Sequence, residues 1–176
     1  MNYFTLFNLP EKFKINKNLL CKNYYQLQLQ FHPDLFIKDS ESQKKIVLEK
    51  SIQINKGYRT LKNFLNRAVY LLSLHGFQIE KETFLLKNNN FLIEYFSLYE
   101  EIDNLKESCF DELLLTSLLK KIKQKINNYE HEIDLEFDKK NFKKVVKITA
   151  KLLFLNKMKL NLKKEHNIYL KKDKLG

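Results

Sequence analysis

The chain has 176 residues, of which only 3 are glycine and 2 are proline, and a formal net charge of +11. This is too little glycine and proline for a turn-rich β architecture, whereas leucine, lysine, isoleucine and phenylalanine are abundant. The composition therefore predicts an all-α protein of one large or two small domains. No apolar run approaches the roughly 20 residues that span a bilayer, and no basic region precedes the first apolar stretch as in a secretion signal, which favours a cytoplasmic protein without membrane contact.

The first 31 residues predict two helices. A short helix begins near Tyr3 and is closed by Leu9-Pro10. The second runs to about Phe31, with Asn16 as its expected N-cap, because an asparagine side chain can accept a hydrogen bond from a free amide of the first turn. Its apolar residues recur at helical spacing as one buried stripe, formed by Leu20, Tyr24, Leu27 and Phe31.

The tripeptide His32-Pro33-Asp34 follows this helix directly. Proline removes a backbone donor and pushes the preceding residue out of the α region, so the helix is predicted to stop there. An exposed turn should follow that presents an imidazole and a carboxylate together. An ordinary helix-terminating turn is the alternative, although nothing local requires His32 and Asp34 to flank the proline.

A second long helix follows, with Asp39 or Ser40 as its expected cap. Its predicted buried stripe consists of Val47, Ser51, Ile54, Tyr58 and Leu61. Two antiparallel helices with facing stripes and an exposed turn between them make a self-sufficient hairpin. A further helix is expected from Asn66 to His75, ended by Gly76 as a C′ glycine.

After a loop and cap at Lys87-Asn88-Asn89-Asn90, three more helices are predicted at about 90–106, 110–130 and 138–170. Residues 76–112 carry 9 acidic and 3 basic side chains, whereas residues 113–176 carry 17 basic and 7 acidic ones. Antiparallel packing of the acidic first helix and the basic last one would therefore be electrostatically favourable.

Helical periodicity divides the apolar residues of these helices between two faces. On the first, the core stripe comprises Phe91, Tyr95, Leu98, Ile102 and Leu105, while Leu92, Ile93 and Phe96 lie away from it, beside Glu100. On the last, the expected inward residues are Val145, Thr149, Leu152, Leu153 and Leu160, with Phe154 and Met158 on another side. Such an excess of apolar surface indicates either a partner site or a thicker core that includes a contact with the N-terminal domain.

The arrangement of helix, His-Pro-Asp turn and helix resembles the J-domain of DnaJ-type co-chaperones. Four further segments resemble HscB, the specialised J-protein of bacterial iron–sulfur cluster assembly: Tyr3 to Pro10, Asn66 to Gly76, Asn90 to Glu94 and Phe154 to Lys157. The resemblance implies a J-domain with its joining helix in residues 1–75, a linker in 76–89 and a C-terminal three-helix bundle in 90–176.

The resemblance also implies two binding sites. The J-domain would dock on the DnaK-type chaperone HscA through His32, Pro33 and Asp34, with Asp34 as the key carboxylate, and would accelerate ATP hydrolysis. Lys22 and Lys38 would support this contact, although Leu35 stands where J-domains usually carry lysine. The C-terminal bundle would hold the scaffold protein IscU through a face formed by Leu92, Ile93, Phe96, Glu100 and Phe154. Ser97 and Asn104 replace acidic residues that are common in the family.

No glycine-rich phosphate loop or nucleophile motif is visible, so we expect a non-enzymatic adaptor. Cys21 and Cys109 lack metal-site spacing, and neither a metal nor a cofactor is predicted. A J-protein that serves another client is one alternative. A small basic nucleic-acid-binding helical protein is another, but only Arg59 and Arg67 among 32 basic residues are arginines, the side chain that base reading favours. This composition argues against nucleic acid as a partner.

Overall fold

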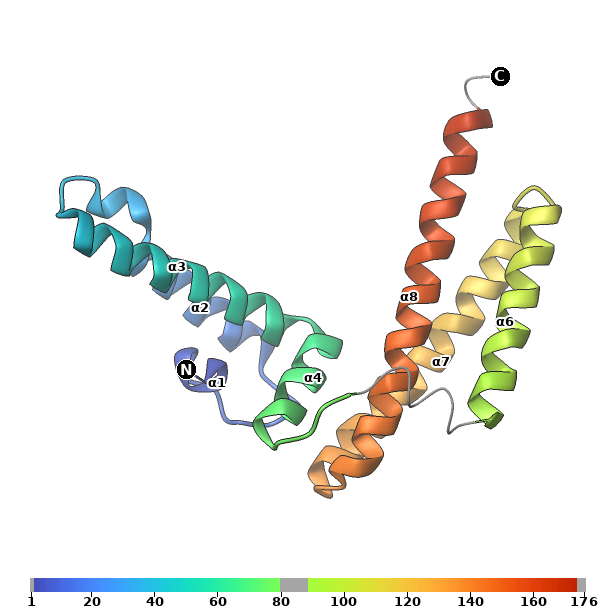
Figure 1. Ribbon diagram of the computed structural model, residues 1–176, viewed down its shortest axis with the longest axis horizontal. Coiled ribbons are helices and arrows are strands. Elements are labelled where there is room, and N and C mark those ends of the chain that lie inside the picture. The colour runs from blue at the N-terminus through green and yellow to red at the C-terminus, as the bar shows by residue number, and fades with distance from the viewer. Residues whose placement is uncertain (1, 80–88, 174–176) are drawn as a thin grey trace. The chain divides into compact units, whose positions relative to one another are not determined.

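The computed structural model of the chain describes residues 2–79 and 89–173, which contain helices and no strand, as predicted (Figure 1). The chain divides into two compact units, Met1–Gly76 and Phe77–Gly176. Residues 80–88, which make up most of the expected linker and of the loop before residue 90, lie outside the described part. Within the described residues, no helix is long and apolar enough to cross a membrane.

The first unit is a helical hairpin with a short helix at each end. Its elements are α1 (Tyr3–Leu6), α2 (Lys17–Phe31), the 3-10 turn η1 (Pro33–Phe36), α3 (Glu41–Lys62) and α4 (Phe64–Leu74). The predicted caps are confirmed: Asn16 accepts a hydrogen bond from the Leu19 amide at 3.0 Å, and Ser40 rather than Asp39 accepts one from the Gln43 amide at 3.3 Å. Gly76 ends α4 at a positive φ of 79°.

The hairpin core follows the predicted stripe of α3 except at one turn. Gly57 is buried there, and a Cβ atom on it would lie only 2.9 Å from Cδ1 of Tyr3 in α1. The absence of a side chain thus lets α1 lie directly on α3. Tyr58, which the stripe placed in the core, is half-buried and stacks on Tyr24 of α2 with 3.9 Å between ring centroids. This stack helps to hold α2 and α3 together at the middle of the hairpin.

The second unit is the predicted bundle of three helices, α6 (Asn89–Glu107), α7 (Glu112–Asp138) and α8 (Phe142–Asp173). Asp111 caps α7 by accepting hydrogen bonds from the Leu113 and Leu114 amides, each at 3.0 Å. The predicted end of this helix at about residue 130 was wrong. Ile133 and Phe137 continue its buried stripe, so α7 extends to Asp138 and α8 begins correspondingly later.

The expected antiparallel packing of α6 and α8 was also wrong. Phe91 at the start of α6 packs near Phe154, with 6.2 Å between ring centroids, and Lys106 at its end pairs with Glu165 at 3.0 Å. Both helices therefore run in the same direction, as short connections in a three-helix bundle require. The acidic side chains of α6 form ion pairs with lysines of α7, namely Glu94–Lys125 and Glu101–Lys121.

The predicted inward face of α8 is confirmed at Val145, Thr149 and Leu152, which are buried, but was wrong further along the helix. Met158 is 1% exposed and belongs to the core, whereas Leu160 is 60% exposed. The buried positions are Val145, Ile148, Thr149, Ala150, Leu152, Leu155, Met158 and Leu162. The apolar run from Leu152 to Leu155 fits several helical phases equally well. Contacts with both α6 and α7 select the one observed.

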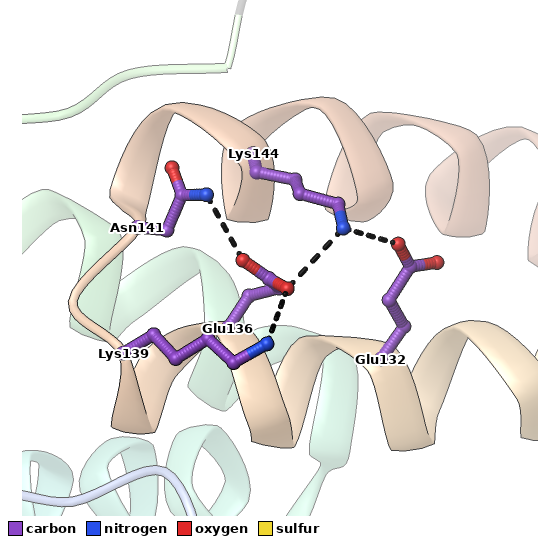
Figure 2. A network of polar contacts seen from close by, with 5 residues as sticks. All are labelled: Glu132, Glu136, Lys139, Asn141 and Lys144. Atoms are coloured by element: carbon purple, nitrogen blue, oxygen red, sulfur yellow. Dashed lines mark hydrogen bonds and ion pairs between the residues drawn. The ribbon is translucent and has the colours of Figure 1, made fainter.

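A buried carboxylate stabilises the turn between α7 and α8 (Figure 2). Glu136 is 5% exposed and accepts hydrogen bonds from Asn141 at 2.9 Å, Lys144 at 3.2 Å and Lys139 at 3.3 Å. Lys144 also pairs with Glu132, one turn earlier in α7, at 3.0 Å. Burial by itself raises the pKa of Glu136, but the hydrogen bonds from Lys144, Asn141 and Lys139 together lower it below its ordinary value.

Replacing Glu136 with glutamine should lower the melting temperature at neutral pH and reduce the loss of stability in acid. A carboxylate whose pKa is lowered by folding stabilises the folded state above its unfolded pKa, and this stabilisation disappears as the pH falls through the folded pKa. Melting curves followed by circular dichroism between pH 7 and pH 3 should therefore fall more steeply for wild type than for Glu136→Gln. The exposed Asp138→Asn serves as control. Parallel pH profiles for wild type and Glu136→Gln would contradict this role.

Candidate functional site

The first candidate site is the turn after α2. His32 leaves the helix with ψ of 127°, and Pro33 occupies the first position of η1, where its fixed φ suits the turn and its missing N–H costs nothing. The Leu35 amide closes the turn on the carbonyl of His32 at 3.0 Å. The backbone thus holds the residues of the His-Pro-Asp motif in one fixed, solvent-exposed loop.

The side chain of His32 orders this loop from within. Its Nδ1 accepts a hydrogen bond from the Asp34 amide at 3.3 Å and lies 3.6 Å from the Asp34 carboxylate. The Asp34 side chain is nevertheless 78% exposed. A carboxylate on a fixed turn can form a charge-assisted, bidentate pair with an arginine of another protein.

The two lysines predicted for this site lie at different distances along the chain from the motif. Lys38 is exposed just beyond η1, four residues after Asp34. Lys22 is exposed on α2, ten residues before His32, which corresponds to about 15 Å along a helix axis. The structure therefore brings together His32, Pro33 and Asp34, with Lys38 nearby in sequence, and leaves Lys22 well up the helix.

Sequence reasoning missed the apolar character of the surface on and after α2. Tyr25 and Leu29, one turn apart on α2, are 65% and 62% exposed. Leu35 and Ile37, in and after η1, are 65% and 67% exposed. The unusual Leu35 was the visible signal for this surface. Helical periodicity gave the same signal for Tyr25 and Leu29, since both fall outside the stripe predicted for α2. Of that stripe, Leu20 is buried, and Tyr24, Leu27 and Phe31 are half-buried.

The second candidate site is the outer face of α6. Ile93 and Phe96 are 69% and 57% exposed, Glu100 is exposed, and Leu92 is half-buried. The residues predicted for the opposite stripe are buried, apart from the half-buried Tyr95. A helix that buries one apolar face and still exposes a second is typical of a binding surface.

Helical periodicity placed Phe154 on a side of α8 away from the core, but in the structure it is half-buried. Its ring is half-buried between α8 and α6, 6.2 Å from the ring of Phe91 and 5.6 Å, edge-on, from that of Tyr95. Phe154 thus adjoins the N-terminal half of α6, the part of the helix that carries Leu92, Ile93 and Phe96. Glu100 lies one helical turn further along α6 than Phe96.

A pair of tyrosines beside this face also escaped sequence reasoning. The Tyr95 hydroxyl lies 3.1 Å from that of Tyr99, and the rings meet edge-on at 4.9 Å. Burial raises the pKa of Tyr95, and the hydrogen bond to Tyr99 raises it further. The spacing of four residues between two tyrosines was the only signal in the sequence.

Nothing in the described residues suits a metal ion. No group of three or more histidine, cysteine, aspartate or glutamate side chains gathers there in a way that could hold one. Cys21 and Cys109 are free and exposed.

Comparisons with known proteins cover nearly the whole chain. Residues 87–163 match the family model of the HSCB C-terminal oligomerisation domain. The co-chaperone protein HscB of Buchnera aphidicola subsp. Acyrthosiphon pisum (strain Tuc7) is 64% identical over 171 residues, which cover 97% of this chain and 98% of that relative.

Solved structures of the same kind of protein share the fold. The chaperone HscB from Vibrio cholerae matches with a TM-score of 0.86 and 30% identity, over 96% of this chain and 99% of the other. The human co-chaperone protein HscB matches with a TM-score of 0.88 and 26% identity, over 94% of this chain and 82% of the other. These matches extend through both compact units.

Proposed function

Because the chain belongs to the HscB family of co-chaperones, we propose that it acts in iron–sulfur cluster assembly by presenting the scaffold protein IscU to the DnaK-type chaperone HscA. It stimulates the ATPase of HscA and performs no catalysis itself. The observation that carries this proposal is the exposed His-Pro-Asp turn of a J-type hairpin, in a chain that matches HscB along nearly its whole length. The free cysteines suit a reducing compartment, and we place the activity in the cytoplasm.

In this proposal the J-domain contact depends on a preorganised carboxylate. Pro33 and the His32 ring fix the turn before the chaperone arrives, so docking loses little conformational entropy there. Asp34 then pairs with an arginine of HscA. Lys38 and, further along α2, Lys22 supply positive charge that guides the encounter with an acidic surface of HscA.

The scaffold contact depends on the outer face of the second unit. Leu92, Ile93 and Phe96 offer an apolar centre, Phe154 borders it and Glu100 adds a polar edge. An apolar centre with a polar rim is the usual composition of a protein interface. Holding IscU while the J-domain engages HscA couples ATP turnover to capture of the scaffold, which promotes transfer of the cluster to acceptor proteins.

Affinity capture with the full chain tests the proposal against its alternatives. The chain should retain both purified HscA and purified IscU, and should raise the steady-state ATPase rate of HscA, further when IscU is present. Capture and stimulation of HscA without any retention of IscU would favour a J-protein for another client. Retention of nucleic acid alone, lost as salt is raised, would favour the basic nucleic-acid-binding alternative.

A further inference from the structure

Tyr99 lies on the flank of α6 that faces α8. It follows Tyr95, whose ring contacts Phe154, by one turn, and it packs partly against the buried core of the bundle. Residues three and four apart on a helix are neighbours, so Tyr99 also adjoins Phe96. The side chain is half-exposed. Tyr99 therefore packs against the edge of the core and lies on α6 at the border of the outer face.

The hydrogen bond between the two tyrosines has a preferred direction. Tyr95 is half-buried among Phe91, Phe154 and Tyr99, and a hydroxyl that is partly withdrawn from water needs a nearby acceptor for its hydrogen. Among residues 89–173, the Tyr99 oxygen is the acceptor that lies within reach, at 3.1 Å. Tyr95 thus donates and Tyr99 accepts. A hydroxyl has one hydrogen, so that of Tyr99 is directed away from Tyr95 and is available to solvent or to a bound molecule.

We infer that Tyr99 is a further contact of the scaffold, and that its hydroxyl donates a hydrogen bond to a carbonyl or carboxylate oxygen of IscU at the border of the outer face. This inference rests on the proposed function. A protein seated on Phe96 and Phe154 would displace water from the neighbouring Tyr99. An acceptor oxygen on the scaffold must then replace the displaced water, since a covered donor without a partner weakens binding. Tyr99 would in this way favour partners that carry an acceptor at that point.

Two matched variants test this role in the full chain. Tyr99→Phe removes the hydroxyl that faces the partner and keeps the ring, so the dissociation constant for purified IscU should rise about threefold to tenfold, as for the loss of one hydrogen bond. Tyr95→Phe removes the same hydrogen bond between the two tyrosines but keeps the Tyr99 hydroxyl that faces the partner. Its dissociation constant should stay within about twofold of wild type. Isothermal titration calorimetry gives the constants, and melting curves confirm that both variants are folded.

Each outcome decides the question. Unchanged binding by Tyr99→Phe would overturn the inference and leave the proposed function intact. Equal weakening by both variants would also overturn it, because the tyrosine pair would then act by holding α6 in shape rather than by contacting the scaffold. Failure of the wild-type chain to bind IscU would overturn the proposed function and the inference with it.

Discussion

Replacing Asp34 with asparagine should abolish most of the stimulation of HscA, with a fall in the stimulated ATPase rate of more than about tenfold. The carboxylate is 78% exposed on a fixed turn, so it is placed to meet a partner. Removing one member of a charge pair that becomes buried on docking costs about 2–5 kcal/mol, and every 1.4 kcal/mol is a factor of ten in affinity. Steady-state ATPase assays with HscA measure the effect.

The same substitution should leave the fold intact. The backbone amide of Asp34 donates a hydrogen bond to Nδ1 of His32, and asparagine preserves both that bond and the size of the side chain. Surface changes usually alter stability by no more than about 0.5 kcal/mol. Asp39→Asn makes the same chemical change in the same exposed loop, five residues later, and should keep full stimulation. Undiminished stimulation by Asp34→Asn, or an equal loss in both variants, would remove the proposed role of this carboxylate.

Local signals were sufficient to predict the hairpin and its turn. Asn16 and Ser40 cap their helices by the side-chain chemistry that identifies them in the sequence. Pro33 stops α2 for a reason that is equally local. The exposure of Asp34 follows from these three features together. By contrast, the burial of Gly57 depends on α1 lying across α3, a tertiary contact that periodicity within α3 does not report.

The second unit was less predictable because its core is shared among three helices. Four consecutive apolar residues, Leu152 to Leu155, allow several phases for α8, and only the combined contacts with α6 and α7 decide that Met158 is buried and Leu160 exposed. The charge balance predicted a wrong direction for α6 and α8, since surface ion pairs are worth fractions of a kcal/mol and short connections determine the topology. The Tyr95–Tyr99 bond depends on ring orientation, which sequence spacing does not determine.

The outer face of α6 can be tested by truncating Leu92 and Phe96 together to alanine. Each anchor at the centre of an interface should contribute more than about 1 kcal/mol, roughly fivefold in affinity. The double variant should therefore bind IscU at least about 25-fold more weakly in calorimetric titrations. It should still stimulate HscA when IscU is absent, because the His-Pro-Asp turn is unchanged.

Two controls separate a binding face from a core and from general loss of apolar surface. Phe96 is 57% exposed and Leu92 half-buried, so the double variant should melt close to wild type. The free energy of unfolding of Leu98→Ala, at a position 1% exposed, should instead fall by about 2–5 kcal/mol.

A pair of exposed leucines on α7 provides the binding control. Truncating Leu113 and Leu114, which are 82% and 53% exposed, removes a similar amount of apolar surface and should leave IscU binding unchanged. A melting temperature for the Leu92 and Phe96 variant as low as that of Leu98→Ala would mean that this face of α6 is structural. Equal weakening of binding by the α7 pair would mean that the scaffold contact lies elsewhere or is not specific to this face.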